Sequence, residues 1–75
     1  MIVRVWMDTP IPMSAVYRIA ASIKNIRGEP YCAGDSMGRF GDIVLSDFPA
    51  DREPLLCEFL TKEMSGFVDR YEVIP

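Results

Sequence analysis

The side chains best suited to chemistry in this sequence are a serine and two cysteines. Ser36 is the third residue of GDSMG (34–38), which matches the G-x-S-x-G pattern of a nucleophile elbow, a strand-to-helix turn that presents a serine to a base. The chain contains no histidine to accept the serine proton, and a strand-like run follows the pattern in place of a helix. We therefore interpret the match as accidental and expect no catalytic residues and no enzymatic activity.

Cys32 and Cys57 are expected to be free thiols. Cys57 lies in LLCEFL (55–60), a helical segment in which a buried thiol is the simplest interpretation. A structural zinc site takes four ligands, and two cysteines without C-x-x-C spacing in a chain without histidine do not supply them. We expect neither a metal nor a cofactor.

The size and composition indicate one folded domain over residues 1–75. The chain is 49% hydrophobic and 25% charged, as in ordinary globular domains. Its longest uncharged stretch, 9–17, contains two prolines and is far shorter than the roughly 20 apolar residues that cross a bilayer. No basic and apolar leader precedes the first strand-like run, so we expect a cytoplasmic protein that does not enter a membrane.

The periodicity of apolar residues changes along the chain in the order β-α-β-β-α-β. This order predicts an α+β fold, the ferredoxin-like split sandwich, with a four-stranded antiparallel sheet and two helices on one face. In the first strand, period-two alternation is expected to turn Val3, Val5 and Met7 toward the helices and Trp6 toward the open face. The opposite orientation is the alternative, since a one-residue error reverses every side chain.

The remaining elements are predicted from apolar stripes at helical spacing, helix-capping residues, and the glycines and prolines that end helices and strands. The first helix ends at about Arg27 with Gly28 as its cap, and its apolar stripe ends at Ile26 or Arg27. Later elements are a short strand over 29–33, a glycine-rich loop over 34–41, a central strand over 42–46, a helix from an Asp51 N-cap to Gly66 with Leu56 and Leu60 in its stripe, and a last strand over 67–74 with Val68 on the open face.

Three surfaces are candidates for binding a partner. Trp6 and Arg4 share the open sheet face, and tryptophan and arginine are enriched at the anchors of interfaces. Arg39 and Phe40 lie in the glycine-rich loop, a second candidate element, for which ligand binding is left open. The acidic side chains Glu58 and Glu63 on the second helix are the third candidate, although a solvated helix face is the common explanation for such residues.

Binding of nucleic acid is not expected. RFGDIVL (39–45) is similar to the third-strand signature of RNA-recognition motifs, whose aromatic side chains stack on bases. However, Asp42 replaces a stacking ring, and the chain carries a net charge of −3. Residues 1–40 carry five basic and three acidic side chains, whereas residues 41–75 carry three basic and eight acidic ones, so phosphate would be repelled by the second half.

The segments GRF (38–40) and VDRYEV (68–73) resemble the small PurS-type subunit of formylglycinamide ribonucleotide synthase over about half of the chain. The resemblance implies a dimeric ferredoxin-like subunit of a metabolic enzyme. The segment DTPIP (8–12) departs from the Leu-Asp-Pro-like segment of that family, so the chain is not assigned to it and no site residue is carried over.

These observations favour a small non-catalytic domain that binds another protein. Small acidic single-domain chains are common among phage-encoded inhibitors of host machinery, including anti-defence proteins of the anti-CRISPR kind. The alternative is a dimeric structural or regulatory subunit of a metabolic enzyme, as in the PurS resemblance. A homodimer is compatible with both hypotheses.

Overall fold

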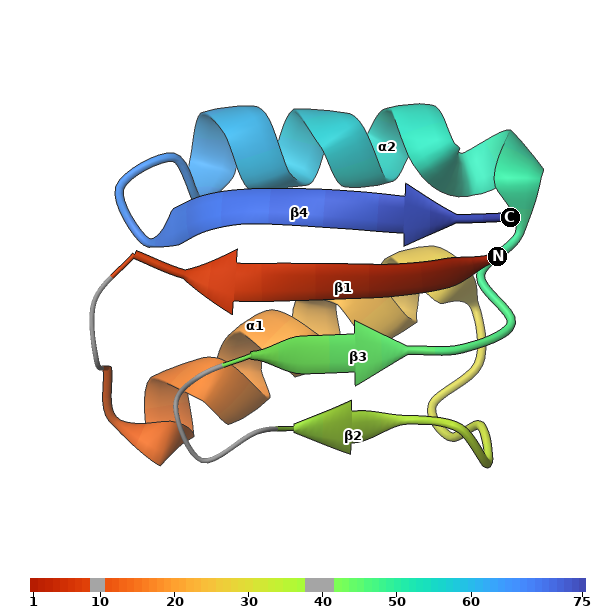
Figure 1. Ribbon diagram of the computed structural model, residues 1–75, viewed down its shortest axis with the longest axis horizontal. Coiled ribbons are helices and arrows are strands. Elements are labelled where there is room, and N and C mark those ends of the chain that lie inside the picture. Colours follow the sequence, from red (N-terminus) through yellow and green to blue (C-terminus); the bar gives the residue numbers. More distant parts are fainter. Residues whose placement is uncertain (9–10, 38–41) are drawn as a thin grey trace.

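The computed structural model describes residues 1–8, 11–37 and 42–75 of an α+β fold with an open, four-stranded antiparallel sheet and two helices (Figure 1). The strand order is β2-β3-β1-β4. The elements are β1 (Ile2–Met7), α1 (Met13–Arg27), β2 (Ser36–Met37), β3 (Ile43–Leu45), a 3-10 turn η1 (Ala50–Arg52), α2 (Glu53–Glu58), a π-helical turn η2 (Phe59–Glu63) and β4 (Val68–Ile74).

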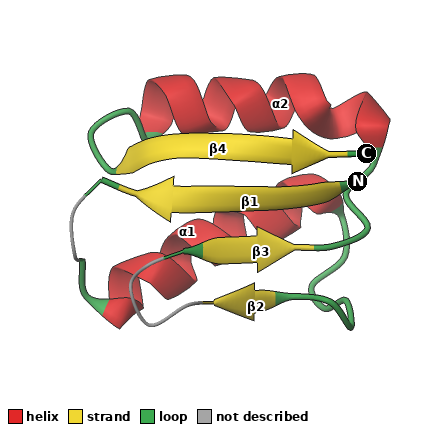
Figure 2. Cartoon of the chain, in the orientation of Figure 1, coloured by secondary structure: helices red, strands yellow, loops and turns green. Residues whose placement is uncertain are grey.

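β1 lies inside the sheet and pairs antiparallel with both β3 and β4 (Figure 2). Val3 and Val5 are fully buried in the core, so Arg4 and Trp6, which alternate with them, lie on the opposite face of the sheet. The predicted orientation of this strand is therefore confirmed. The core below the sheet also takes in buried side chains from both helices and the loops, namely Val16, Ile19, Ala20, Ile23, Ile43, Leu45, Phe48, Leu56 and Leu60.

α1 ends where it was predicted to end. Gly28 has φ 97°, and its N–H donates to the carbonyl of Lys24, so a residue without a Cβ terminates the helix in the left-handed conformation. Arg52 donates from Nη1 to the carbonyl of Ile26 at 3.0 Å and so binds the end of α1 to the start of the second helical segment. The last buried position of the stripe is Arg27, whereas Ile26 is half-buried.

The predicted second strand over 29–33 is wrong, because β2 is Ser36–Met37. The chain after α1 instead follows the guanidinium of Arg27, whose Nε and Nη2 both donate to the carbonyl of Glu29. A turn then forms in which Asp35 N–H donates to the carbonyl of Cys32 at 3.1 Å. These polar contacts take the place of a strand ladder over this run.

The second helical segment differs from the prediction at both ends. Asp51 lies in the 3-10 turn, and the residue before α2 is Arg52, which makes no side-chain capping bond; the Asp51 N-cap is therefore wrong. At the other end the helix continues as a π-helical turn to Glu63, in which Met64 N–H donates to the carbonyl of Phe59, so it does not reach Gly66. Leu56 and Leu60 are buried, as the stripe predicts.

β4 contains an irregularity that reverses one predicted side chain. Trp6 is opposite Arg70, but Met7 is opposite Val68, so the register shifts between these pairs. An extra residue in one strand of a pair changes which face the following side chains occupy. Val68 therefore packs against the core and does not lie on the open face, where the simple alternation placed it.

Within the described residues, no helix is long and apolar enough to cross a membrane.

Candidate functional site

The outer face of the sheet is defined here by the side chains that alternate with the core. Register places Arg4 between Val44 on β3 and Glu72 on β4, and it places Trp6 beside Arg70. On this outer sheet face, one tryptophan and three aliphatic side chains therefore alternate with two arginines and a glutamate. Its residues are Ile2, Arg4, Trp6, Val44, Arg70, Glu72 and Ile74.

Two guanidinium groups, those of Arg4 and Arg70, lie over the indole ring of Trp6. The Cζ atom of Arg4 lies 4.8 Å from the centroid of the indole ring, and the Cζ atom of Arg70 lies 4.2 Å from it. Both distances are within the range of cation–π attraction, which contributes about 0.5–1 kcal/mol at exposed sites. The two arginines therefore order a half-buried tryptophan at the surface and surround it with positive charge.

Arg4 also has an unused hydrogen-bond donor. Its Nε atom is buried and has no hydrogen-bond partner among the described residues. A buried donor without a partner is unfavourable by roughly 1–3 kcal/mol, so such groups are rare in folded proteins. A carboxylate is the acceptor that binds a guanidinium group most strongly.

Glu58 and Glu63 lie on the other side of the molecule, where the helices cover the sheet. They line one shallow hollow of about 420 Å³ between α1 and the second helical segment. Ser22, Asn25, Ile26, Leu55 and Phe59 complete its lining. The structure thus brings Glu58 and Glu63 together, and Arg4 and Trp6 together, but it places the two pairs on opposite faces. The candidates Arg39 and Phe40 lie outside the described residues.

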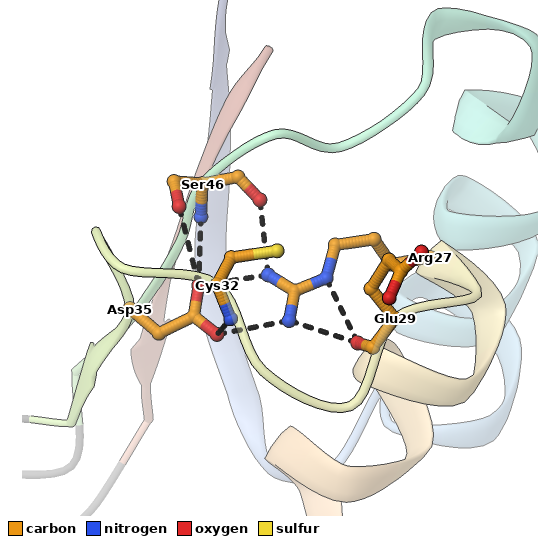
Figure 3. Close-up of polar contacts among 5 residues, drawn as sticks. All are labelled: Arg27, Glu29, Cys32, Asp35 and Ser46. Atoms are coloured by element: carbon orange, nitrogen blue, oxygen red, sulfur yellow. Dashed lines mark hydrogen bonds and ion pairs between the residues drawn. The ribbon is translucent and has the colours of Figure 1, made fainter.

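A polar network that the sequence analysis missed connects α1 to the sheet (Figure 3). Arg27 donates from Nη1 to Asp35 Oδ1 at 2.7 Å and from Nη2 to Asp35 Oδ2 at 2.9 Å, and both side chains are nearly inaccessible to solvent. Arg27 Nη1 also donates to the carbonyl of Ser46. Asp35 in turn accepts from the backbone N–H groups of Cys32 and Ser46.

These bonds explain the ionisation of the pair. Hydrogen bonding from Arg27, and then from the Ser46 and Cys32 backbone, outweighs desolvation and lowers the pKa of Asp35 to about 2. The bond to Asp35 raises the pKa of Arg27. Both groups are therefore charged at neutral pH, and their donors and acceptors are engaged with each other and with the backbone. We interpret the network as structural, because it leaves no reactive group free.

The arrangement around Ser36 does not form a nucleophile elbow. Ser36 lies in β2 opposite Val44, not in a strand-to-helix turn. Cys32 and Cys57 are both free and half-buried. Among residues 1–8, 11–37 and 42–75, no group of three or more histidine, cysteine, aspartate and glutamate side chains is arranged to hold a metal ion.

Of the two features that were missed, one had a signal in the sequence. Arg27 continues the apolar stripe of the first helix after Ile23, and a charged residue on a buried stripe calls for an internal partner of opposite charge. Arg70 alternates in phase with Glu72 in the last strand, but its position beside Trp6 depends on the pairing of distant strands. Nothing local in the sequence specifies that pairing.

Comparison of the chain with protein-family models, curated proteins and solved structures finds no match.

Proposed function

We propose that the chain is a non-catalytic domain that binds another protein through its outer sheet face. The observation that carries the proposal is the grouping of Arg4, Trp6 and Arg70, with both guanidinium groups within 5 Å of the indole centroid. Interface hot spots are enriched in tryptophan and arginine and lie at the centre of the buried patch. Here Arg4 and Arg70 flank Trp6, and the aliphatic side chains of Ile2, Val44 and Ile74 lie on the same face.

The partner that fits this face carries carboxylates. Within the paired strands, the outer sheet face carries Arg4 and Arg70 against Glu72, although the whole chain is acidic. An acidic protein surface with an apolar centre satisfies the tryptophan and the arginines together. The partner's activity distinguishes the two hypotheses for the chain. An anti-defence inhibitor should reduce that activity on binding, whereas an enzyme subunit should support it.

We also propose that the fold is the ferredoxin-like split β-α-β-β-α-β sandwich. The order of the elements supports this assignment, as does the position of β1 between β3 and β4. The fold serves many unrelated functions, so the assignment adds nothing to the choice of partner.

The test is a tagged pull-down from lysate of the source cells with two charge-reversed variants beside the wild type. The variant that combines Arg4→Glu with Arg70→Glu should no longer capture a stoichiometric partner. The variant that combines Glu58→Lys with Glu63→Lys should still capture it. Circular dichroism should show that both variants remain folded. The reverse pattern would move the binding site to the helical face, and loss of the partner after nuclease treatment would indicate nucleic acid as the ligand.

A further inference from the structure

β2 is the edge strand on the side of the sheet that α1 covers. Figure 1 shows β2 as the outermost strand there, with α1 behind this half of the sheet, whereas α2 lies alongside β4 at the opposite edge. An edge strand presents backbone N–H and C=O groups that can pair with another strand. In the described part of the chain, the β2 edge is therefore the edge without a helix alongside it.

The hydrogen bonds of the sheet identify the backbone groups at this edge. Met1 and Phe48 exchange two backbone bonds, so the odd-numbered residues of β1 bond to β3. The residues of β3 opposite them face β1, and Val44, which lies between those residues, faces Ser36 of β2. Because bonded residues alternate along a strand, the N–H and C=O groups of Met37 are directed away from β3, toward the edge of the described sheet.

Two hollows lie between this edge and α1, and together they are named the edge groove. The larger hollow, of about 480 Å³, has Tyr17, Ala21, Lys24 and Met37 in its lining. The smaller hollow, of about 180 Å³, also has Lys24 and Met37 in its lining, with Tyr31 beside them. Because the two hollows share these residues, they adjoin one another along the edge.

The edge groove follows from the spacing of residues on α1. Val16 and Ile23 belong to the stripe that is buried against the sheet. Tyr17, Ala21 and Lys24 form a neighbouring stripe at helical spacing, in which the aromatic side chain of Tyr17 is 54% exposed and the small side chain of Ala21 leaves space beside it. A strand added beside β2 would cover this neighbouring stripe.

An added antiparallel strand would direct one of its side chains into the larger hollow. The residue opposite Met37 would exchange both backbone bonds with it, and the side chains of directly opposite residues lie on the same face. Met37 is itself opposite Ile43 and packs against the core, so this face is the one that α1 covers. An aromatic or long aliphatic side chain at this position would lie against Tyr17 and Ala21.

The charges of the edge groove favour a carboxylate near that apolar side chain. Lys24 lines both hollows, whereas Asp35, the one acidic side chain among their described lining residues, forms the two-pronged pair with Arg27. The ammonium group of Lys24 is therefore the charge that a ligand meets. Side chains two residues apart in a strand share a face, so a carboxylate at that spacing lies on the same side as the apolar side chain.

We propose that the edge groove binds an extended segment of a partner protein by strand addition to β2. The segment pairs antiparallel at Met37, places an apolar side chain in the larger hollow and presents a carboxylate, two residues away, to Lys24. Strand addition obtains affinity from backbone bonds and specificity from pockets for alternate side chains. The edge groove shares no described lining residue with the outer sheet face, so this inference does not rest on the proposed function.

Titration of the isotope-labelled chain with a blocked peptide, acetyl-TETFTET-amide, tests the groove by NMR. The peptide should bind with a Kd below about 1 mM and should shift the backbone amide resonances of Met37 and Lys24. N-methylation of the phenylalanine nitrogen removes the N–H that pairs with Met37 and should weaken binding about tenfold. Ala21→Trp, at an exposed position of α1, fills the larger hollow and should abolish binding.

A charge exchange tests recognition by Lys24. Lys24→Glu should weaken the affinity for the glutamate peptide about tenfold and should make acetyl-TKTFTKT-amide the preferred peptide. Arg18→Glu makes the same charge change at an exposed position of α1 outside both hollows, and it should leave the order of the two peptides unchanged. Circular dichroism should show that both variants remain folded.

Three results would overturn the proposal. The first is a wild type whose Met37 and Lys24 resonances stay unchanged at peptide concentrations well above 1 mM, on the order of tenfold. The second is a Lys24→Glu variant that keeps the wild-type order of the two peptides. The third is a shift of the Met37 resonance with protein concentration in the absence of peptide, which would identify a second copy as the occupant. The variant that combines Arg4→Glu with Arg70→Glu should bind the glutamate peptide like the wild type, so the proposed function and this inference can fail separately.

Discussion

Arg27 at the end of α1 and Asp35 before β2 form a two-pronged ion pair, with Nη1–Oδ1 and Nη2–Oδ2 distances of 2.7 and 2.9 Å. The carbonyl of Ser46, just after β3, accepts a further bond from Arg27. One pair of side chains thus joins the first helix to the connection before β2 and to the end of β3. It compensates for a second strand that has two residues and few ladder bonds of its own.

Removing one member of this pair should be costly for folding. Asp35→Ala leaves the guanidinium of Arg27 buried without its counter-ion, and breaking a buried pair in this way typically costs about 3–5 kcal/mol. Urea unfolding measures the change in the free energy of unfolding. Asp51→Ala, at an exposed position, is the control and should unfold like the wild type. Equal midpoints for the two variants would show that the ion pair contributes nothing to stability.

Replacing both members should be less harmful than replacing Asp35 alone. Arg27→Met combined with Asp35→Ala removes the unpaired charge and leaves an apolar side chain of similar length. We predict that the double variant is more stable than Asp35→Ala, so that the two substitutions are strongly non-additive in a double-mutant cycle. Simple additivity would mean that the two residues act independently.

The same pair should make stability depend on pH in an acidic window. The pKa of Asp35 is lowered from its ordinary value of 3.8 to about 2 in the folded chain, so the folded state holds this proton less tightly than the unfolded state. The contribution is fully present above pH 3.8 and is lost as the pH falls to about 2, and it amounts to roughly 2 kcal/mol. The difference in unfolding free energy between wild type and Asp35→Asn should shrink over that range. A constant difference would contradict this assignment.

Two neighbouring leucines test the packing of the second helical segment. Leu60 is 2% exposed, whereas Leu55 is 56% exposed on the same segment. Leu60→Ala should cost about 2–5 kcal/mol because it opens a cavity in the core. Leu55→Ala should have little effect, and chemical denaturation of both variants gives the comparison. Similar losses for both would contradict the burial of this stripe.

Much of the fold was predictable, because periodicity fixes which side chains share a face. The alternation of Val3 and Val5 with Arg4 and Trp6 was enough to orient β1, and Gly28 marked the end of α1. The error over 29–33 has a specific cause. The guanidinium of Arg27 binds the carbonyl of Glu29, which a strand would use for its ladder. Arg27 and its partner Asp35 are eight residues apart, and a contact at that separation leaves no periodic pattern in the sequence.

The candidate site was predictable in part for the same reason. Trp6 and Arg4 follow from alternation within one strand, so their shared face was apparent from local sequence. Arg70 reaches Trp6 through strand pairing across most of the chain, and Val68 turns inward at an irregularity in that pairing. Register shifts of this kind have no reliable local signature.

Trp6→Ala should separate binding from folding. The side chain lies on the face opposite the core, so its truncation should leave the helical circular dichroism and melting temperature close to those of the wild type, while a hot-spot tryptophan costs about 2 kcal/mol or more in binding. Tyr31→Ala, at a position that is 76% exposed, is an aromatic control away from this face. A large fall in melting temperature would instead place Trp6 among the residues that stabilise the fold.

The most direct measurement uses the fact that Trp6 is the one tryptophan of the chain. Labelling the chain with 5-fluorotryptophan gives a single fluorine resonance from the outer sheet face, and unlabelled partner adds no signal. We predict that the captured partner shifts and broadens this resonance at stoichiometric ratio. We also predict that Arg4→Glu combined with Arg70→Glu abolishes the change. A complex that forms while the Trp6 resonance stays unchanged would contradict binding through this face.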